Sequence, residues 1–97
     1  PATLPPPPLI TVELSPPKGG DTSVLLRRAR NLVGLADAIN LPDCQRAILK
    51  MSAMATACLV GRETGLPTVW QLTCRDRNLL ALQADLLGGH ALGIRAV

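Results

Sequence analysis

The chain has 97 residues, of which 47% are hydrophobic, and this composition is typical of a globular rather than a disordered protein. Phe and Tyr are absent and there is one Trp, so aliphatic side chains must fill most of the core. The formal net charge is +3, but the ten basic residues are scattered among seven acidic ones without interleaved aromatics. This pattern argues against a nucleic-acid-binding surface, which needs a basic stripe or a stacking platform.

The three cysteines form no CxxC pair, and their odd number favours free thiols in a reducing compartment over a disulfide framework. There is no run of about 18 apolar residues that could cross a membrane. The start of the chain lacks the charged and apolar regions of a signal peptide. We therefore expect a cytoplasmic protein that binds neither nucleic acid nor membrane.

Residues 1–9 contain a run of four prolines, which predicts an extended lead-in or linker. Residues 10–97 are predicted to form the folded part. Its first strand is expected over residues 10–15, where alternation separates Glu13 from its apolar neighbours. Two prolines then stop the strand and a Gly-Gly turn leads into a helix.

A helix N-cap is expected at Asp21, Thr22 or Ser23, and Gly34 is expected to end the helix. Its predicted apolar face consists of Leu25, Leu26, Ala29, Leu32 and Val33. A second short strand is predicted over residues 36–41, with Asn40 near its end.

A long helix is predicted over residues 45–64, stopped by the Gly-Leu-Pro sequence that follows it. Its expected buried face consists of Ile48, Met51, Ala55, Cys58 and Leu59. A third strand is predicted over residues 68–74, with Gln71 and Thr73 on the face opposite Trp70.

Asn78 is expected to cap a third helix that ends near Gly88 and Gly89, and residues 94–97 resemble the opening of a fourth strand. The order β-α-β-α-β-α-β predicts an α/β fold with a parallel sheet. The repeat of about thirty residues fits a (β/α)₈ TIM barrel, of which the chain would supply the first three βα units and the start of strand four. An open sheet is the alternative, although no GxGxxG follows any predicted strand.

Polar residues fall at the predicted strand ends, which is where parallel α/β folds bind ligands. These residues are Glu13, Asn40, Gln71 and Thr73. They predict a ligand site; the alternatives are a satisfied polar network or solvent-exposed strand ends. Glu13 is the candidate proton donor or base, and an ion pair with Lys18 or Arg75 is its competing use. No cluster of His, Cys and carboxylates has metal-ligand spacing.

Four segments together resemble the amino-terminal part of the methylenetetrahydrofolate reductase family. They are Val12–Gly19 (VELSPPKG), Asp37–Asn40 (DAIN), Gln71–Asn78 (QLTCRDRN) and Ala91–Arg95 (ALGIR). The likeness spans residues 9–97 and is greatest to the branch fused to homocysteine methyltransferase domains or encoded beside corrinoid-pathway proteins. The LTCRDRN run is its most specific piece.

The resemblance implies a flavoprotein barrel that reduces 5,10-methylenetetrahydrofolate to 5-methyltetrahydrofolate with FAD, in one-carbon metabolism and methionine biosynthesis. Electrons would come from NAD(P)H or a partner redox protein. Glu13 matches the family's general acid, whereas Asn40, Gln71 and Thr73 fall at flavin-contacting positions. Many members have Thr at the Asn40 position and His at the Gln71 position.

The family also has a Gly-Asp pair near the end of its fourth strand, which this sequence does not reach. We therefore expect a fragment of the reductase that does not turn over folate as an isolated chain. The alternative is a non-catalytic partial-barrel module, which would self-associate or pair with a complementary barrel half to cover its sheet edges.

Overall fold

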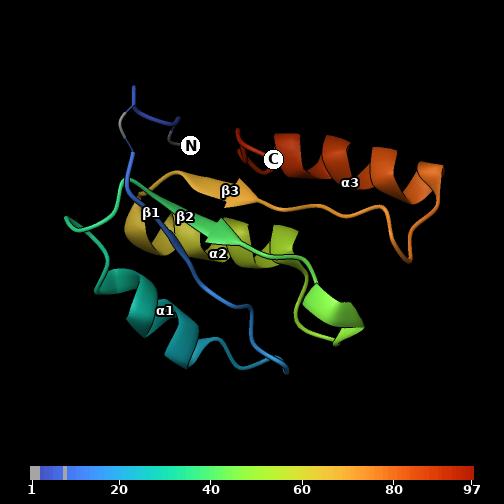
Figure 1. The fold of residues 1–97 in the computed structure, drawn as a ribbon, viewed down its shortest axis with the longest axis horizontal. Coiled ribbons are helices and arrows are strands. Elements are labelled where there is room, and N and C mark those ends of the chain that lie inside the picture. The colour runs from blue at the N-terminus through green and yellow to red at the C-terminus, as the bar shows by residue number, and fades with distance from the viewer. Residues whose placement is uncertain (1–2, 8) are drawn as a thin grey trace.

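A computed structural model of the chain describes residues 3–7 and 9–97; residues 1, 2 and 8 of the predicted lead-in lie outside it. The elements in chain order are β1 (Thr11–Glu13), α1 (Ser23–Arg30), β2 (Ala38–Leu41), a 3₁₀ turn η1 (Gln45–Ala47), α2 (Ala53–Thr64), β3 (Thr68–Trp70) and α3 (Leu79–Ala91). The three strands are parallel and adjacent in the order β1-β2-β3. The predicted α/β fold is confirmed, and its order matches the first βα units of a TIM barrel (Figure 1).

The sheet has two unlike faces. Helices α1 and α2 cover one of them, whereas the strands lie uncovered on the side that faces the viewer in Figure 1. Ile39 and Leu41 point to the helix side, where they are fully buried. Since side chains alternate along a strand, Asn40 and its in-register neighbour Glu13 belong to the uncovered side.

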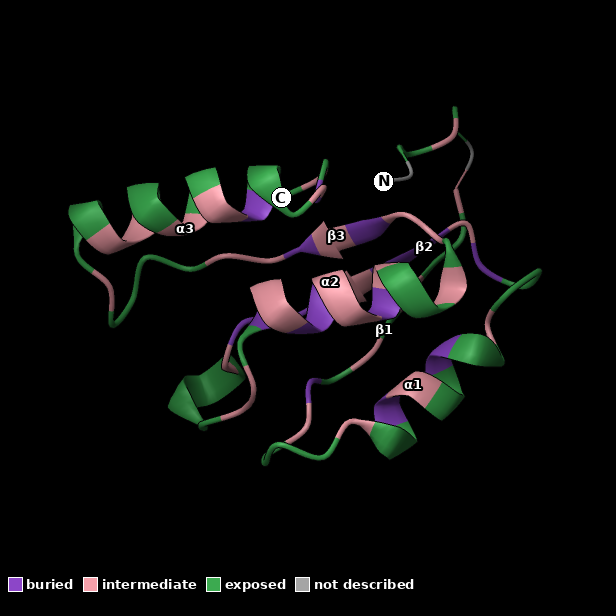
Figure 2. Cartoon of the chain, turned by 180° about the vertical axis from the view of Figure 1, so that it is seen from behind, coloured by how far each residue is buried: buried purple, intermediate pink, exposed green. Residues whose placement is uncertain are grey.

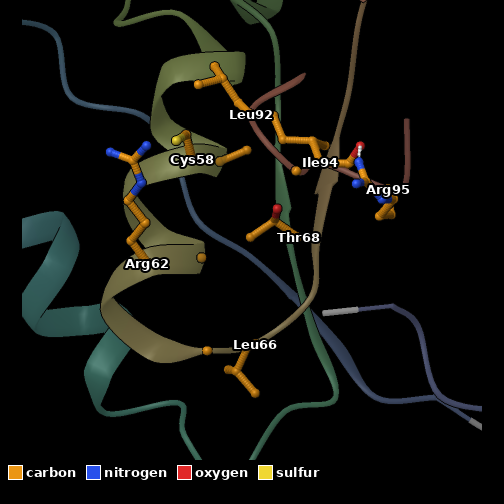
Figure 3. Close-up of a pocket in the computed structure, with 11 residues that line it drawn as sticks. Cys58, Arg62, Leu66, Thr68, Leu92, Ile94 and Arg95 are labelled. Carbon is orange, nitrogen blue, oxygen red and sulfur yellow. Dashed lines mark hydrogen bonds between the residues drawn. The ribbon is translucent and has the colours of Figure 1, made fainter. Parts of the chain in front are cut away.

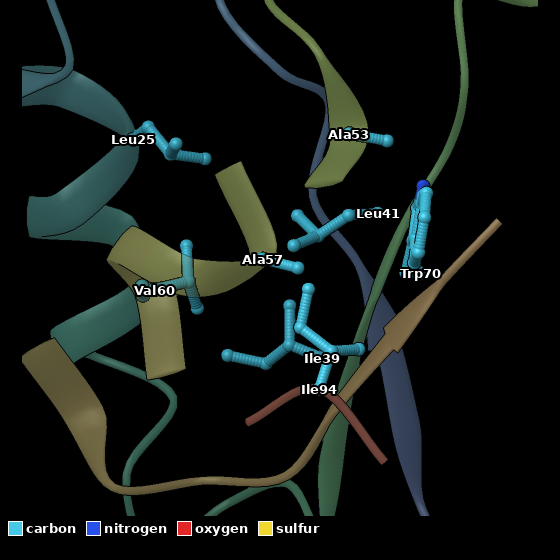
Figure 4. Close-up of a cluster of buried hydrophobic side chains, with 9 residues drawn as sticks. Leu25, Ile39, Leu41, Ala53, Ala57, Val60, Trp70 and Ile94 are labelled. Atoms are coloured by element: carbon cyan, nitrogen blue, oxygen red, sulfur yellow. The ribbon is translucent and has the colours of Figure 1, made fainter. Parts of the chain in front are cut away.

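The hydrophobic core lies between the sheet and the helices (Figure 4). Its buried members are Leu25, Ala29, Ile39, Leu41, Ala53, Ala57, Val60, Trp70 and Ile94. Figure 2 shows the same division by burial, with the buried parts of α1 and α2 turned inward. Trp70, the single aromatic, is 2% exposed and is the largest of the buried side chains.

Helix α3 contacts the core through glycine. Gly89 is the buried residue of this helix, and a Cβ atom added there would lie inside van der Waals distance of the Trp70 ring, with Cε3 at 3.0 Å. Asn78 caps the helix as predicted, since its side chain accepts a hydrogen bond from the Ala81 N–H at 2.8 Å. The helix runs to Ala91 rather than ending at Gly88 and Gly89, because the close approach to Trp70 needs a glycine inside the helix.

The prediction of one helix over residues 45–64 is wrong. Helix α2 begins at Ala53, where the Ser52 side chain accepts from the Ala55 N–H at 3.4 Å. Upstream, Arg46 and Ala47 have φ angles of 58° and 59°, which no α-helix contains.

The predicted buried faces of the first two helices are only partly right. In α1, Leu25 and Ala29 are buried, but Val33 lies beyond the helix and is 52% exposed. That helix ends at Arg30, and Gly34, with φ of 86°, lies in the turn that follows. In α2 the buried residues are Ala53, Thr56, Ala57 and Val60, and not the predicted set. Because α2 begins at Ala53, Ile48 and Met51 lie outside the helix. The face of α2 that packs against the sheet is therefore a different one from the face that was predicted.

The strands are shorter than predicted, although backbone hydrogen bonds extend the ladders by a residue. The Leu14 N–H donates to Asn40 O at 3.0 Å, and the Gln71 N–H donates to Leu41 O at 3.1 Å. The predicted fourth strand is present as one parallel bridge between Val69 and Ala96. The Trp70 N–H donates to Ala96 O at 3.0 Å, so a fourth strand begins on the free side of β3.

Candidate functional site

Three of the four predicted site residues lie on the uncovered face at the carboxyl ends of the strands. Glu13 and Asn40 are direct partners in the β1–β2 register, and Asn40 pairs in turn with Val69 of β3. Gln71 follows Val69 by two positions, so alternation places it on the same side. An acid and two amides therefore share one face of the sheet, in the order of the strands that carry them.

These three side chains keep functional groups that the described part of the chain does not use. The Asn40 amide donates from Nδ2 to Thr11 Oγ1 at 3.1 Å, which leaves its carbonyl oxygen available. Neither Glu13 nor Gln71 has a side-chain hydrogen bond to the described residues, and Glu13 is exposed. The ion pair that competes for Glu13 does not form: Arg75 pairs with Asp76 at 3.2 Å, and the described ion pairs do not include Lys18.

Thr73, the fourth predicted site residue, is held by a neighbour that sequence reasoning missed. Its N–H and its hydroxyl donate to Asp43 Oδ2 at 3.0 and 3.2 Å. Arg77 binds both oxygens of the same carboxylate and also donates to Thr73 O at 2.9 Å. With its hydroxyl proton given to Asp43, Thr73 could meet a ligand only as an acceptor.

Asp43, Thr73 and Arg77 form a hydrogen-bonded clamp between the loops that follow β2 and β3, with Asp43 at its centre. Its side chain is 1% exposed and the Arg77 side chain is 23% exposed. Burial alone would raise the pKa of the Asp43 carboxyl, but the hydrogen bonds from Arg77 and Thr73 and the Arg77 charge together lower it. Asp43 in return raises the pKa of Arg77, mainly through their hydrogen bond. The pair is therefore fully ionised at neutral pH.

A signal for this clamp was present in the sequence. Asp43 follows Pro42 directly at the end of an apolar strand, where a buried carboxylate would need a cation. Two arginines, Arg75 and Arg77, stand in the most specific motif of the chain. What the sequence could not supply was the pairing, since 34 positions separate Asp43 from Arg77.

Two hollows flank opposite ends of the sheet. One, of about 620 Å³, lies at the carboxyl ends of β2 and β3 beside Gln71. The other, of about 330 Å³, lies near the start of β3, between α2 and the segment after α3 (Figure 3). Its labelled lining includes Cys58, Arg62 and Thr68. Ligands of α/β folds bind at the carboxyl ends of strands, so the first hollow belongs to the candidate site.

A comparison with protein-family models matches residues 6–97 to the family described as methylenetetrahydrofolate reductase. The match covers nearly the whole chain. The chain belongs to this family. Neither the curated proteins nor the solved structures that were searched gave a match.

Membership in the methylenetetrahydrofolate reductase family confirms the resemblance seen in the sequence, and it relates the chain to a folate-linked oxidoreductase. The family model does not separate branches, so the likeness to the methyltransferase-fused branch stays a prediction. The cysteines Cys44, Cys58 and Cys74 are all free thiols. Among residues 3–7 and 9–97, no helix has the length and apolar character needed to cross a bilayer.

Proposed function

We propose that the chain is part of a flavin-dependent reductase that converts 5,10-methylenetetrahydrofolate to 5-methyltetrahydrofolate. The observation that carries the proposal is the in-register placement of Glu13 beside Asn40, with Gln71 on the same face of the next strand. Family membership supplies the substrate class and the reaction type. The site residues are assigned by the resemblance and by this placement.

The residues on the uncovered face fit a flavin. An isoalloxazine ring presents alternating hydrogen-bond donors and acceptors along one edge, and the Asn40 carbonyl and the Gln71 amide offer both complements. A bound reduced FAD would supply the hydride for the one-carbon unit. NAD(P)H or a partner redox protein would renew it.

Glu13 is assigned the role of general acid. Its carboxyl group lies at the strand end on the uncovered face and forms no ion pair with the described residues. When protonated it can donate to a folate nitrogen as the five-membered ring of the substrate opens to an iminium, the form that accepts hydride. In this proposal Asn40 orients the flavin beside it.

The isolated chain is proposed to lack turnover because its ligand face is open. Glu13 is exposed and three strands cover only part of the circle that eight strands close. Water would compete for every polar group on this face. In a closed barrel the same groups would lie in a partly desolvated cavity, where hydrogen bonds and charges act more strongly.

The test is folate-dependent oxidation of reduced flavin in a complete barrel that contains this segment. Glu13→Gln should lower the rate about 10²- to 10⁴-fold while flavin absorbance is retained. The matched control is Glu63→Gln, which removes a carboxylate that pairs with Arg30 at 2.5 Å on the helix side of the sheet. Equal rates for Glu13→Gln and the unchanged barrel would refute the assignment.

A second candidate function is a partial-barrel module that associates with a second copy or a complementary half. The exposed leucines of α3 favour it: Leu79, Leu80, Leu86 and Leu87. Exposed apolar helix surface and open sheet edges are covered in stable assemblies. Light scattering of the isolated chain at high concentration tests association with a second copy, which a monomer would refute.

A further inference from the structure

The hollow at the carboxyl ends of β2 and β3 has the character of an anion site. Its volume is about 620 Å³, within the range of small-molecule sites. All the residues that line it have polar or charged side chains: Asp43, Gln45, Arg46, Gln71, Thr73 and Arg75. Two guanidinium groups and two side-chain amides thus supply donors to one space.

The carboxylate in this lining does not repel an anion. Asp43 is 1% exposed, and its two oxygens already accept four hydrogen bonds from Thr73 and Arg77. The Arg77 charge neutralises it. What remains toward the hollow is the positive charge of Arg46 and Arg75.

Arg75 is held in place but keeps donors to give. Its Nη2 donates to Cys44 O at 2.9 Å, which fixes the guanidinium across the two loops. Its ion pair with Asp76 is on the surface, because the Asp76 side chain is 76% exposed. A surface pair of this kind contributes little, so an incoming oxyanion can take its place. A guanidinium has five N–H groups, and two parallel ones suit a phosphate or carboxylate.

Arg46 is presented by a strained backbone. Cys44, Arg46 and Ala47 all have positive φ angles of 38°, 58° and 59°, a conformation that costs energy for residues with side chains. Strained backbone conformations of this kind are frequent at ligand-binding sites, where the surrounding structure stabilises them. The Met51 N–H anchors the far end of this loop on Pro17 O at 2.7 Å. The Arg46 side chain makes no hydrogen bond or ion pair within the described part of the chain.

We propose that Arg46 and Arg75 bind an oxyanion, either a phosphate or a carboxylate, of a ligand whose body lies on the uncovered face beside Gln71. This inference deepens the proposed function and rests on it for the identity of the ligand. Two ligands of that reaction carry such a group: the flavin, through its phosphate, and the folate, through its glutamyl carboxylates.

The first experiment uses the isolated 97-residue chain and inorganic phosphate. The ¹H–¹⁵N signals of the arginine Nε–H groups and the Gln71 amide are followed during the titration. We expect saturable shifts with a dissociation constant of about 1 mM, in keeping with a pocket that binds a small ion. Arg75→Gln and Arg46→Gln should each weaken binding at least about tenfold, which is the loss of one charge-assisted contact.

The matched control is Arg28→Gln, an exposed arginine of α1 on the other side of the sheet, which should bind phosphate unchanged. If Arg75→Gln alters the loop, Arg46→Gln still tests the proposal, because the Arg46 side chain makes no described hydrogen bond or ion pair. Shifts that do not saturate, or that persist equally in both variants, would overturn the inference.

Paired ligands then identify the source of the oxyanion. Tighter binding of flavin mononucleotide than of riboflavin assigns the site to the flavin phosphate. Tighter binding of tetrahydrofolate than of tetrahydropteroate, which lacks the glutamyl group, assigns it to the substrate tail. If phosphate binds at the arginines but neither pair differs, the anion site stands and its assignment to the flavin or the folate fails; the reductase function itself is tested by the Glu13→Gln rate.

Discussion

Asp43→Asn is the substitution whose cost follows most directly from the structure. The Asp43 carboxylate is 1% exposed and accepts two hydrogen bonds from Thr73 and two from Arg77. Asparagine has nearly the same shape and can still accept from Thr73, but it removes the charge and one of the Arg77 bonds. Breaking a buried pair costs about 3–5 kcal/mol, and the 23% exposure of Arg77 lets water relieve part of that. We expect the free energy of unfolding at pH 7 to fall by about 2–4 kcal/mol.

The assay is urea unfolding followed by far-ultraviolet circular dichroism. The matched control is Asp76→Asn, whose exposed pair with Arg75 should contribute less than about 1 kcal/mol. The loss of about 2–4 kcal/mol expected for Asp43→Asn is large for a small domain, whose total stability is about 5–15 kcal/mol. A difference between Asp43→Asn and the unchanged chain below about 0.5 kcal/mol would refute the reasoning.

Acid provides an independent check on the same residue. The pKa of Asp43 is lowered in the folded chain, so the unfolded chain takes up a proton first as the pH falls. The contribution of Asp43 is therefore complete above the unfolded value of about 3.9 and is lost as the pH falls through the folded one. The stability difference between the unchanged chain and Asp43→Asn should narrow only below about pH 4. A difference that shrinks between pH 7 and 5 would mean that another group is responsible.

Further predictions concern the helices, each measured by thermal and urea unfolding. Gly89→Ala should destabilise the chain by about 1–3 kcal/mol because the new methyl group meets the Trp70 ring, with Cε3 at 3.0 Å. Gly88→Ala is its control: the nearest atom would be 3.9 Å away, so better helix propensity should make it neutral or stabilising by up to about 1 kcal/mol. Removing either side-chain cap, by Asn78→Ala or Ser52→Ala, should cost about 1 kcal/mol. Asn78→Ala should lower the free energy of unfolding more than Ser52→Ala does, since the Asn78 hydrogen bond of 2.8 Å is shorter than the 3.4 Å bond of Ser52.

The sequence predicted the features that local pattern controls. Alternating and helical periods located three strands and three helices, and the Asn78 cap was placed correctly. The helix prediction failed at residues 45–52, where apolar residues continue at helical spacing but Arg46 and Ala47 adopt positive φ angles. That backbone depends on contacts with distant loops, such as the Met51 N–H to Pro17 O bond, which no window of sequence contains. The same limit hid the Asp43–Arg77 pair, although each residue alone could be recognised as polar and near a strand end.

The polar groups at the carboxyl ends of the strands fall into two classes. Asp43, Thr73 and Arg77 satisfy one another, so their chemistry is consumed in joining two loops. Glu13 and Gln71 have no such partners in the described part of the chain. Polar side chains without hydrogen-bond partners add nothing to the stability of the fold, so their alignment on one face is consistent with ligand binding.

The proposed ligand site on the uncovered face would depend on the clamp formed by Asp43, Thr73 and Arg77 for a physical reason. Gln71 can present its amide at a fixed point only if the loop after β3 does not move, and the Thr73 bonds to Asp43 lie two residues away. If the clamp holds Gln71 in position for a ligand, Asp43→Asn should reduce the protection of the Thr73 amide from hydrogen exchange. It should also broaden the NMR signal of the Gln71 side-chain amide. Glu13→Gln should change neither, because Glu13 lies on β1 and does not contact the loop through any described hydrogen bond. Loss of protection at Thr73 with an unchanged Gln71 signal would separate the two features and leave the clamp as a purely structural one.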